Sequence, residues 1–287
     1  MSIIRQIGIR RSPPARSARA ERWASFLVAC ALGVIAGCES LPPAAGPALR
    51  SPARPGPAAL PAPVRTIVID PGHGGDDPGT SHYGLKEKHL VLDMARRLRA
   101  QLQSAGLTAV LTRDRDQFIP LSRRPAIANR LPADLFVSVH VNANRNSSVS
   151  GVEVYYPRTS VVSASAQWPP SLTPAEIAIP STTVKQVLWD LVLRRTRVQS
   201  RKLAFTICRA MRNGLNVPCR GTKPARFVVL REAWMPSVLV EVGYVTNRAE
   251  AQRLGSAEYR QAAAQAIAQG ILAYVRELGA QHIEPRA

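Results

Sequence analysis

Two histidines and two glutamates, in four separate stretches of the chain, have the side chains of a hydrolytic zinc site. His73 lies in the segment DPGHGG, Glu87 in GLKEK, His140 in SVHVN and Glu241 in LVEVG. Two imidazoles and one carboxylate are a zinc ligand set that leaves a fourth position open for water. A further carboxylate can serve as the base for that water. Residue types alone leave Glu87 and Glu241 interchangeable in these roles.

The two histidines each fall at the end of an expected strand. His73 follows the apolar run Thr66–Asp70 and stands between glycines, which let the backbone turn sharply and expose the imidazole. His140 closes the run Leu135–Val141, in which alternation puts Phe136, Ser138 and His140 on one face. Ligand sites of open α/β sheets lie beyond the carboxyl ends of strands. We therefore expect the two imidazoles to converge if their strands are parallel.

The two glutamates occupy positions that a purely structural role explains less well. Glu87 precedes Val91 by four residues and so shares the inward face of an expected helix, Lys86–Ser104. A carboxylate there also stabilises the helix N-terminus, which is the competing interpretation. Glu241 interrupts the apolar strand Val238–Val242, where a lone carboxylate is costly unless it is paired or lies beside a metal. We assign Glu87 as ligand and Glu241 as base.

The segments that must position these residues alternate between strand-like and helix-like patterns. This alternation predicts a single α/β domain, residues 65–279, with a mostly parallel twisted sheet, helices on both faces and the zinc site at the carboxyl ends of strands. His82 and His89 are expected to face solvent. The remaining predicted strands are Thr108–Thr112, Val152–Tyr156 and Phe227–Leu230, and the remaining predicted helices are Ser122–Arg130, Val184–Arg212 and Ala257–Glu277.

The first 38 residues predict an export signal. Six arginines precede an apolar stretch, residues 23–37, that is too short to span a bilayer comfortably. The stretch ends in VIAGC, which resembles a bacterial lipoprotein signal with Cys38 as the lipidated residue; an ordinary cleaved signal peptide is the alternative. Residues 39–64 have the composition of a Pro/Ala-rich tether. We expect an exported, periplasmic domain held by a lipid anchor, with the outer membrane favoured.

The charge and the aromatic content indicate which class of partner the protein binds. The formal charge is +19, and 32 basic against 18 acidic residues remain from Cys38 onward. Aromatic residues make up 5% of the chain and do not interleave with the basic ones, so no nucleic-acid partner is expected. Cell-wall polymers with free carboxylates fit better, although a solvated surface would also account for the charge.

In an oxidising compartment Cys208 and Cys219 can form a disulfide; two reduced thiols are the other interpretation.

Taken together, these residues resemble the zinc-dependent N-acetylmuramoyl-L-alanine amidases of bacterial cell-wall hydrolysis, the type 3 amidases. The resemblance runs from Thr66 to Tyr274. It implies one Zn²⁺ held by His73, Glu87 and His140, with Glu241 as the catalytic glutamate. It also implies peptidoglycan as substrate, cleaved at the amide between the lactyl group of N-acetylmuramic acid and L-alanine. The family's segments occur in order as DPGHGG (70–75), DPG (77–79), EK (87–88), LTR (111–113), AN (128–129), SVHVN (138–142), GVEVYY (151–156) and MPSVLVE (235–241).

Two further expectations follow from the resemblance, and rival functions stand beside it. Arg113 and Asn142 are candidates for substrate binding, Arg113 through a peptide carboxylate, although a plain surface arginine is the alternative. Some relatives carry an inserted segment at the position of residues 158–183 that covers the site until a partner displaces it. We therefore expect Glu176 or this segment to restrain the site and an activator protein to relieve the restraint; a plain substrate-groove loop is the alternative. Rival functions are another zinc amidohydrolase or carboxypeptidase, or a catalytically silent wall-binding regulator, which the four intact site residues disfavour.

Overall fold

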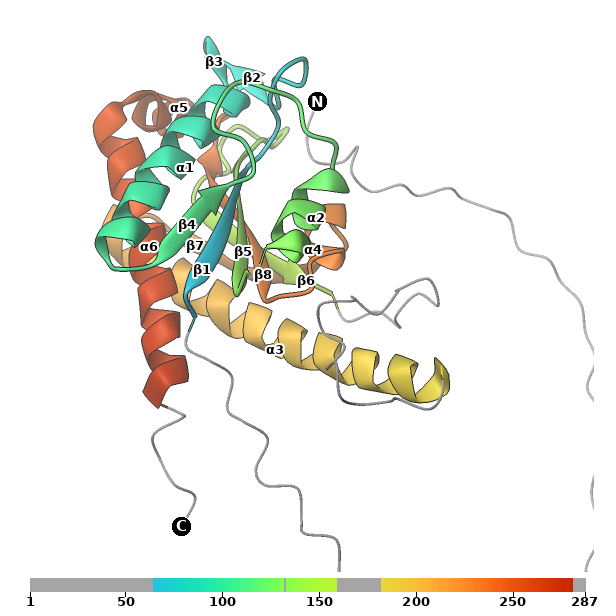
Figure 1. The fold of residues 1–287 in the computed structure, drawn as a ribbon. Coiled ribbons are helices and arrows are strands. Elements are labelled where there is room, and N and C mark those ends of the chain that lie inside the picture. Colours follow the sequence, from blue (N-terminus) through green and yellow to red (C-terminus); the bar gives the residue numbers. More distant parts are fainter. Residues whose placement is uncertain (1–63, 132, 159–181, 281–287) are drawn as a thin grey trace, which may run out of the picture. The chain divides into compact units, whose positions relative to one another are not determined.

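A six-stranded sheet organises the part of the chain that the computed structural model describes, residues 64–131, 133–158 and 182–280 (Figure 1). The strand order is β4-β1-β5-β8-β6-β7. The first four strands are parallel, β6 runs antiparallel to β8, and β7 is parallel to β6. The strands are β1 (Thr66–Pro71), β4 (Thr108–Leu111), β5 (Leu135–Asn142), β6 (Val152–Pro157), β7 (Cys219–Ala225) and β8 (Ser237–Tyr244).

Helices cover both faces of this sheet, as the alternating pattern predicted (Figure 1). One face packs against the long helices α1 (Glu87–Ser104), α3 (Thr182–Leu215) and α6 (Ala257–Ala280). The other face carries the short helices α2 (Arg123–Arg130) and α4 (Val228–Arg231). A further helix, α5 (Arg248–Gly255), follows β8. Within the described ranges, no helix combines the length and apolar character needed to cross a membrane.

The central strands β5 and β8 form the most deeply buried part of the sheet. Every residue of both strands is buried, because parallel strands between two helical layers have no solvent-facing side. Alternate residues of β5 belong to different clusters: Val137 and Val139 pack with the long helices, whereas Phe136 packs with the short ones. The second cluster covers only part of its face, and the polar residues Ser138, His140 and Glu241 occupy the rest, toward the strand ends.

The prediction of a strand at Phe227–Leu230 is wrong. Val228–Arg231 forms the short helix α4, and the preceding segment Cys219–Ala225 forms the edge strand β7 instead. The β-branched valines suggested a strand, but the last strand of a sheet is half exposed and can be built from polar residues. Pro224 is compatible with that place, since proline is tolerated at sheet edges. The small β2–β3 hairpin (Ser81–His82 and Leu85–Lys86) and helix α5 were also not predicted.

The remaining predicted helices and strands are present, with boundaries shifted by one to three residues. Several predicted features lie outside the described residues: the signal segment with Cys38, the tether up to residue 63, Glu176 with most of segment 158–183, and the tail from residue 281.

Candidate metal centre and catalytic carboxylate

The structure brings His73, Glu87 and His140 together at the carboxyl ends of β1 and β5. These strands are parallel and adjacent, so the loop after β1 and the last residues of β5 meet at one edge of the sheet. The ligand atoms of the three residues lie within 4.8 Å of one another. Glu87 Oε1 is 3.2 Å from His73 Nε2 and 3.0 Å from His140 Nδ1. Tetrahedral ligands at zinc bond lengths lie about 3.3 Å apart, so the spacing fits one small metal ion.

Contacts outside the cluster orient two of its residues, His73 and Glu87. His73 Nδ1 lies 2.7 Å from Asp77 Oδ2, which leaves Nε2 toward the cluster. Nε2 is buried and makes no hydrogen bond to any described residue, as expected for an atom reserved for a metal. Glu87 Oε2 accepts hydrogen bonds from the backbone N–H and hydroxyl of Thr80, at 2.8 and 3.1 Å, which fixes Oε1 between the imidazoles.

The loop that carries His73 is held in an unusual conformation. His73 has φ of 58°, in the left-handed region that few residues with side chains adopt. The preceding Gly72 lies against the His140 ring, where an added Cβ would come within 2.2 Å of the imidazole. Only glycine permits this close approach, so Gly72 allows both histidines to reach one point.

Two buried arginines stabilise this loop by binding its carbonyl oxygens. Arg113 donates to the carbonyls of Pro71, at 3.0 Å, and Gly72, at 2.7 Å. Arg124 donates to the carbonyls of Pro71 and His73, both at 2.8 Å, and pairs with Asp70 at 3.0 Å. Arg113 is only 1% exposed, so it is not a surface arginine. Its guanidinium donates to backbone carbonyls, which gives it a structural role, and its contact with a peptide carboxylate stays a prediction.

The local electrostatics favour a cation at the cluster. Burial alone would lower the pKa of His73, but the Asp77 and Glu87 carboxylates raise it to about 10. Burial opposes ionisation of Glu87, yet the hydrogen bond with His140 and the ion pair with His73 keep the pKa of Glu87 well below its usual range. Burial lowers the pKa of His140 below its usual value, so this imidazole is held neutral, as a metal ligand must be. The negative charges that favour a proton on His73 also favour a metal ion at the same place.

Glu241 lies beside the cluster without a hydrogen bond to the described part of the chain. It is fully buried on β8, directly across from His140 on β5. Neither carboxylate oxygen makes a hydrogen bond to a described residue. Burial first, and then the charges of Glu87 and Glu153, hold the pKa of Glu241 well above its usual range. Such a carboxylate has a strong tendency to take up a proton, which suits a general base.

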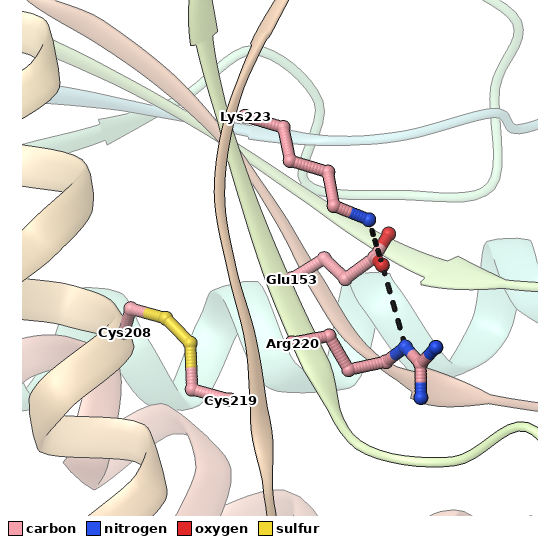
Figure 2. The surroundings of a disulfide bond; sticks show 5 residues. All are labelled: Glu153, Cys208, Cys219, Arg220 and Lys223. Atoms are coloured by element: carbon pink, nitrogen blue, oxygen red, sulfur yellow. Dashed lines mark hydrogen bonds and ion pairs between the residues drawn. A yellow bond between two sulfur atoms is a disulfide. The ribbon is translucent and has the colours of Figure 1, made fainter.

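The other predicted residues separate into three groups. His82 and His89 are exposed and do not join the cluster, as predicted. Asn142 is buried, with Nδ2 3.4 Å from Glu153 Oε2 and Oδ1 accepting from the Ala143 N–H. Cys208 on α3 and Cys219 at the start of β7 form a disulfide, with Cα atoms 5.9 Å apart (Figure 2).

Sequence reasoning did not single out Glu153 and Lys223. Glu153 stands opposite Glu241 in the β6–β8 ladder, and Lys223 Nζ lies 2.5 Å from its Oε1. The available signal was the alternation in GVEVYY, which puts one acid between two inward valines. It could be interpreted only once β6 was known to pair with β8.

The fold and the site together define a hydrolase of the α/β class with a candidate metal centre at the strand ends. The family model N-acetylmuramoyl-L-alanine amidase (Amidase_3) matches residues 67–273, so the chain belongs to this family. It is 39% identical over 221 residues to the amidase AmiA of Escherichia coli K12, covering 73% of this chain and 76% of AmiA. It is 38% identical over 218 residues to AmiC of Neisseria meningitidis, covering 73% of this chain and 52% of AmiC.

A solved structure shows the same fold. AmiC2 of Nostoc punctiforme is 37% identical and superposes with a TM-score of 0.57, covering 74% of this chain and 97% of that one. The predicted family, fold class and enzymatic activity are therefore confirmed: the chain is a peptidoglycan hydrolase acting on the amide between N-acetylmuramic acid and L-alanine. Family membership also argues against the silent regulator and the carboxypeptidase.

Proposed function

We propose that the amidase depends on one zinc ion, held by His73, Glu87 and His140, and that Glu241 is its general base. The observation that carries this proposal is that two buried polar groups without hydrogen bonds in the described part of the chain lie near each other. His73 Nε2 and both oxygens of Glu241 are buried, lack hydrogen bonds to described residues, and lie at the same edge of the sheet. Two nitrogens and one oxygen are ligands that zinc prefers in hydrolytic sites.

The residues of the site then divide the reaction between them. A zinc ion bound here would polarise the scissile carbonyl and acidify water. Asp77 keeps the His73 ring in the orientation that presents Nε2. Glu241 takes a proton from the attacking water and delivers it to the L-alanine nitrogen as that amine leaves. The buried position of Glu241 keeps its carboxylate free of competing hydrogen bonds until water and substrate enter.

Metal analysis combined with product mass tests this function. Purified protein should hold about one zinc per chain, and digestion of peptidoglycan should release intact stem peptides with a free L-alanine amine. Release of a single terminal residue would indicate a carboxypeptidase, and no release would indicate a binding protein. A Glu241→Gln variant serves as the matched negative control, since it retains the three proposed ligands.

We also propose that residues 65–279 act as a catalytic domain exported behind the signal segment 1–38 and tether 39–64, and anchored through lipid on Cys38 in the outer membrane. The supporting observation is the signal pattern itself, together with the cell-wall substrate. A Cys38→Ser variant should move from the membrane to the soluble periplasmic fraction, and the mature N-terminus of the wild type should carry the mass of a diacylglyceryl cysteine. An unlipidated wild type would rule out the anchor.

An activator protein is the partner that we propose for this domain. Helix α3 exposes Val187, Leu191, Val198 and Phe205, which recur along one side of the helix and supply apolar area for a protein contact. One related structure, the CwlD amidase of Clostridioides difficile, 25% identical with a TM-score of 0.60, was solved in complex with the GerS lipoprotein.

Deleting residues 160–182 tests the restraint proposed for segment 158–183 and Glu176: activity should rise without an activator, and unchanged activity would refute the restraint.

A further inference from the structure

A second carboxylate lies beside Glu241, and the proposed mechanism does not use it. Glu153 on β6 is 3% exposed and stands opposite Glu241 in the ladder with β8. Its Oε2 accepts from the Tyr155 hydroxyl, at 2.6 Å, and faces the Asn142 amide, at 3.4 Å. Its Oε1 faces two cations on the neighbouring strand, described next. Glu153 is therefore fully partnered, in contrast to Glu241.

The two cations come from the edge strand β7. Lys223 Nζ lies 2.5 Å and Arg220 Nε 3.6 Å from Glu153 Oε1, and Figure 2 shows both side chains converging on this carboxylate. Both side chains are nevertheless about half exposed, at 45% for Lys223 and 42% for Arg220. Two positive charges meet one negative charge here. One positive charge therefore remains in excess on the side that faces solvent.

The start of β7 is fixed more firmly than an edge strand usually is. Cys219, immediately before Arg220, is joined through the disulfide to Cys208 on α3 (Figure 2). The Arg220 Nη1 group lies 3.4 Å from the Ser150 carbonyl. The disulfide restricts the backbone from which Arg220 projects. Arg220 and Lys223 are thus pre-positioned cations rather than mobile surface groups, which lowers the entropy cost of holding a ligand.

The distance from Glu241 sets what these cations can reach. Strand β7 lies two positions from β8 in the order β8-β6-β7. Neighbouring strands are about 4.8 Å apart, so the backbone of β7 lies about 10 Å from that of β8. The charged ends of Arg220 and Lys223 reach back to Glu153 on β6, which puts them between about 5 and 10 Å from the catalytic carboxylate. An extended peptide advances about 3.4 Å per residue. A peptide that begins at the scissile amide therefore brings its second or third residue within reach of these two cations.

We propose that Arg220 and Lys223 bind a carboxylate of the stem peptide, one or two residues beyond the L-alanine, with Glu153 as the buried counter-charge that holds them. The proposal rests on the amidase function above and adds a specificity determinant to it. An arginine and a lysine suit this ligand, because the guanidinium binds a carboxylate through paired N–H groups and the ammonium adds a charge.

Three matched substrates test the proposal on the full-length zinc enzyme. They are a muramoyl tripeptide with free carboxylates and two analogues in which the carboxylate of the second residue, or of the third, is a carboxamide. The wild type should show a KM about tenfold higher for one of the two amides, with kcat changed much less. Arg220→Gln and Lys223→Met should raise KM for the free acid to a similar extent and remove the discrimination between acid and amide.

The controls separate recognition from a structural role. Arg209→Gln removes one exposed cation from α3, where Arg209 pairs with Glu277, and should leave the discrimination intact. In the double variant Lys223→Met with Glu153→Gln, the buried charge is removed together with its partner, so folding is preserved and discrimination should still be lost. Equal losses on all three substrates, or a wild type that cleaves all three with the same KM, would overturn the proposal. Cleavage of none would contradict the amidase function itself.

Discussion

Glu153 and Glu241 occupy directly opposed positions on the antiparallel strands β6 and β8, yet their surroundings are opposite in character. Both oxygens of Glu153 face donors, whereas neither oxygen of Glu241 has a hydrogen-bond partner among the described residues. A buried carboxylate without partners destabilises a fold, and a protein retains one where function requires it. The charge of Glu153 contributes, after burial and Glu87, to the raised pKa of Glu241. The sheet thus places a satisfied carboxylate beside an unsatisfied one.

Replacing Glu241 by glutamine should remove activity without removing the metal. We expect amidase activity to fall at least about 100-fold, because the proton acceptor is lost. The melting temperature should stay the same or rise, since a buried, unpartnered acid becomes neutral. Product release, zinc content and thermal melting measure the three effects. Glu232→Gln, on the partly exposed residue after α4, is the matched control. Loss of zinc together with activity would instead make Glu241 a ligand.

Removal of the metal should inactivate the enzyme reversibly and lower its melting temperature. A chelator strips an ion that binds only the folded state, so the apparent stability falls with the free metal concentration. Adding zinc back should restore both activity and melting temperature. His73→Ala and His140→Ala should behave like the stripped protein, with little zinc by elemental analysis. His89→Ala, on an exposed residue of α1, should behave like the wild type. An active, zinc-free His140→Ala protein would refute the assignment.

Much of the site followed from local patterns. The strand ending at His140 and the glycines around His73 predicted two imidazoles at the carboxyl end of a parallel sheet, because these features depend on short segments only. The inward position of Glu87 followed from helical periodicity in the same way. The roles of the two glutamates did not follow from residue type and needed the family resemblance.

The edge of the sheet could not be predicted because its residues look like a loop. The segment CRGTKPA of β7 is polar and contains glycine and proline, so it has neither the alternation nor the composition of a strand. Lys223 meets Glu153 only because β7 pairs with β6, a contact between residues 70 positions apart. The burial of Arg113 could not be predicted for a related reason: its partners are backbone carbonyls, which leave no trace in the sequence.

Arg113 should prove essential for the loop that carries His73. Substitution by lysine keeps the charge but loses the planar set of donors that binds the Pro71 and Gly72 carbonyls. We expect Arg113→Lys to destabilise the fold by about 2 kcal/mol and to weaken zinc binding through the displaced loop. Arg115→Lys, two residues on and exposed, is the matched control. If Arg113→Lys instead raises only KM for peptidoglycan, substrate binding would be its role after all.

The disulfide should contribute measurably to stability. Replacing both Cys208 and Cys219 by serine releases a closed loop with a sequence separation of 11 residues. In the chain-entropy account such a loop is worth about 3 kcal/mol. Urea unfolding of the oxidised wild type and the double variant measures the difference. A reduced wild type should match the variant. Equal stability of all three would show that the cross-link has no energetic role.

The buried pair of Asp70 and Arg124 should make stability depend on pH in the acid range. Burial opposes the charge of Asp70, but Arg124, at 3.0 Å, with Thr112 and Ser138, lowers the pKa of Asp70 below its usual value. A carboxylate with a lowered folded-state pKa stabilises the fold fully above its unfolded-state pKa of about 4, and this contribution is lost as the pH falls through the folded-state value. Asp70→Asn leaves Arg124 unpaired and should cost about 3 kcal/mol near neutral pH. Urea unfolding from about pH 6 to about pH 3 should show this difference shrinking; a constant difference would assign the stabilisation to packing rather than charge.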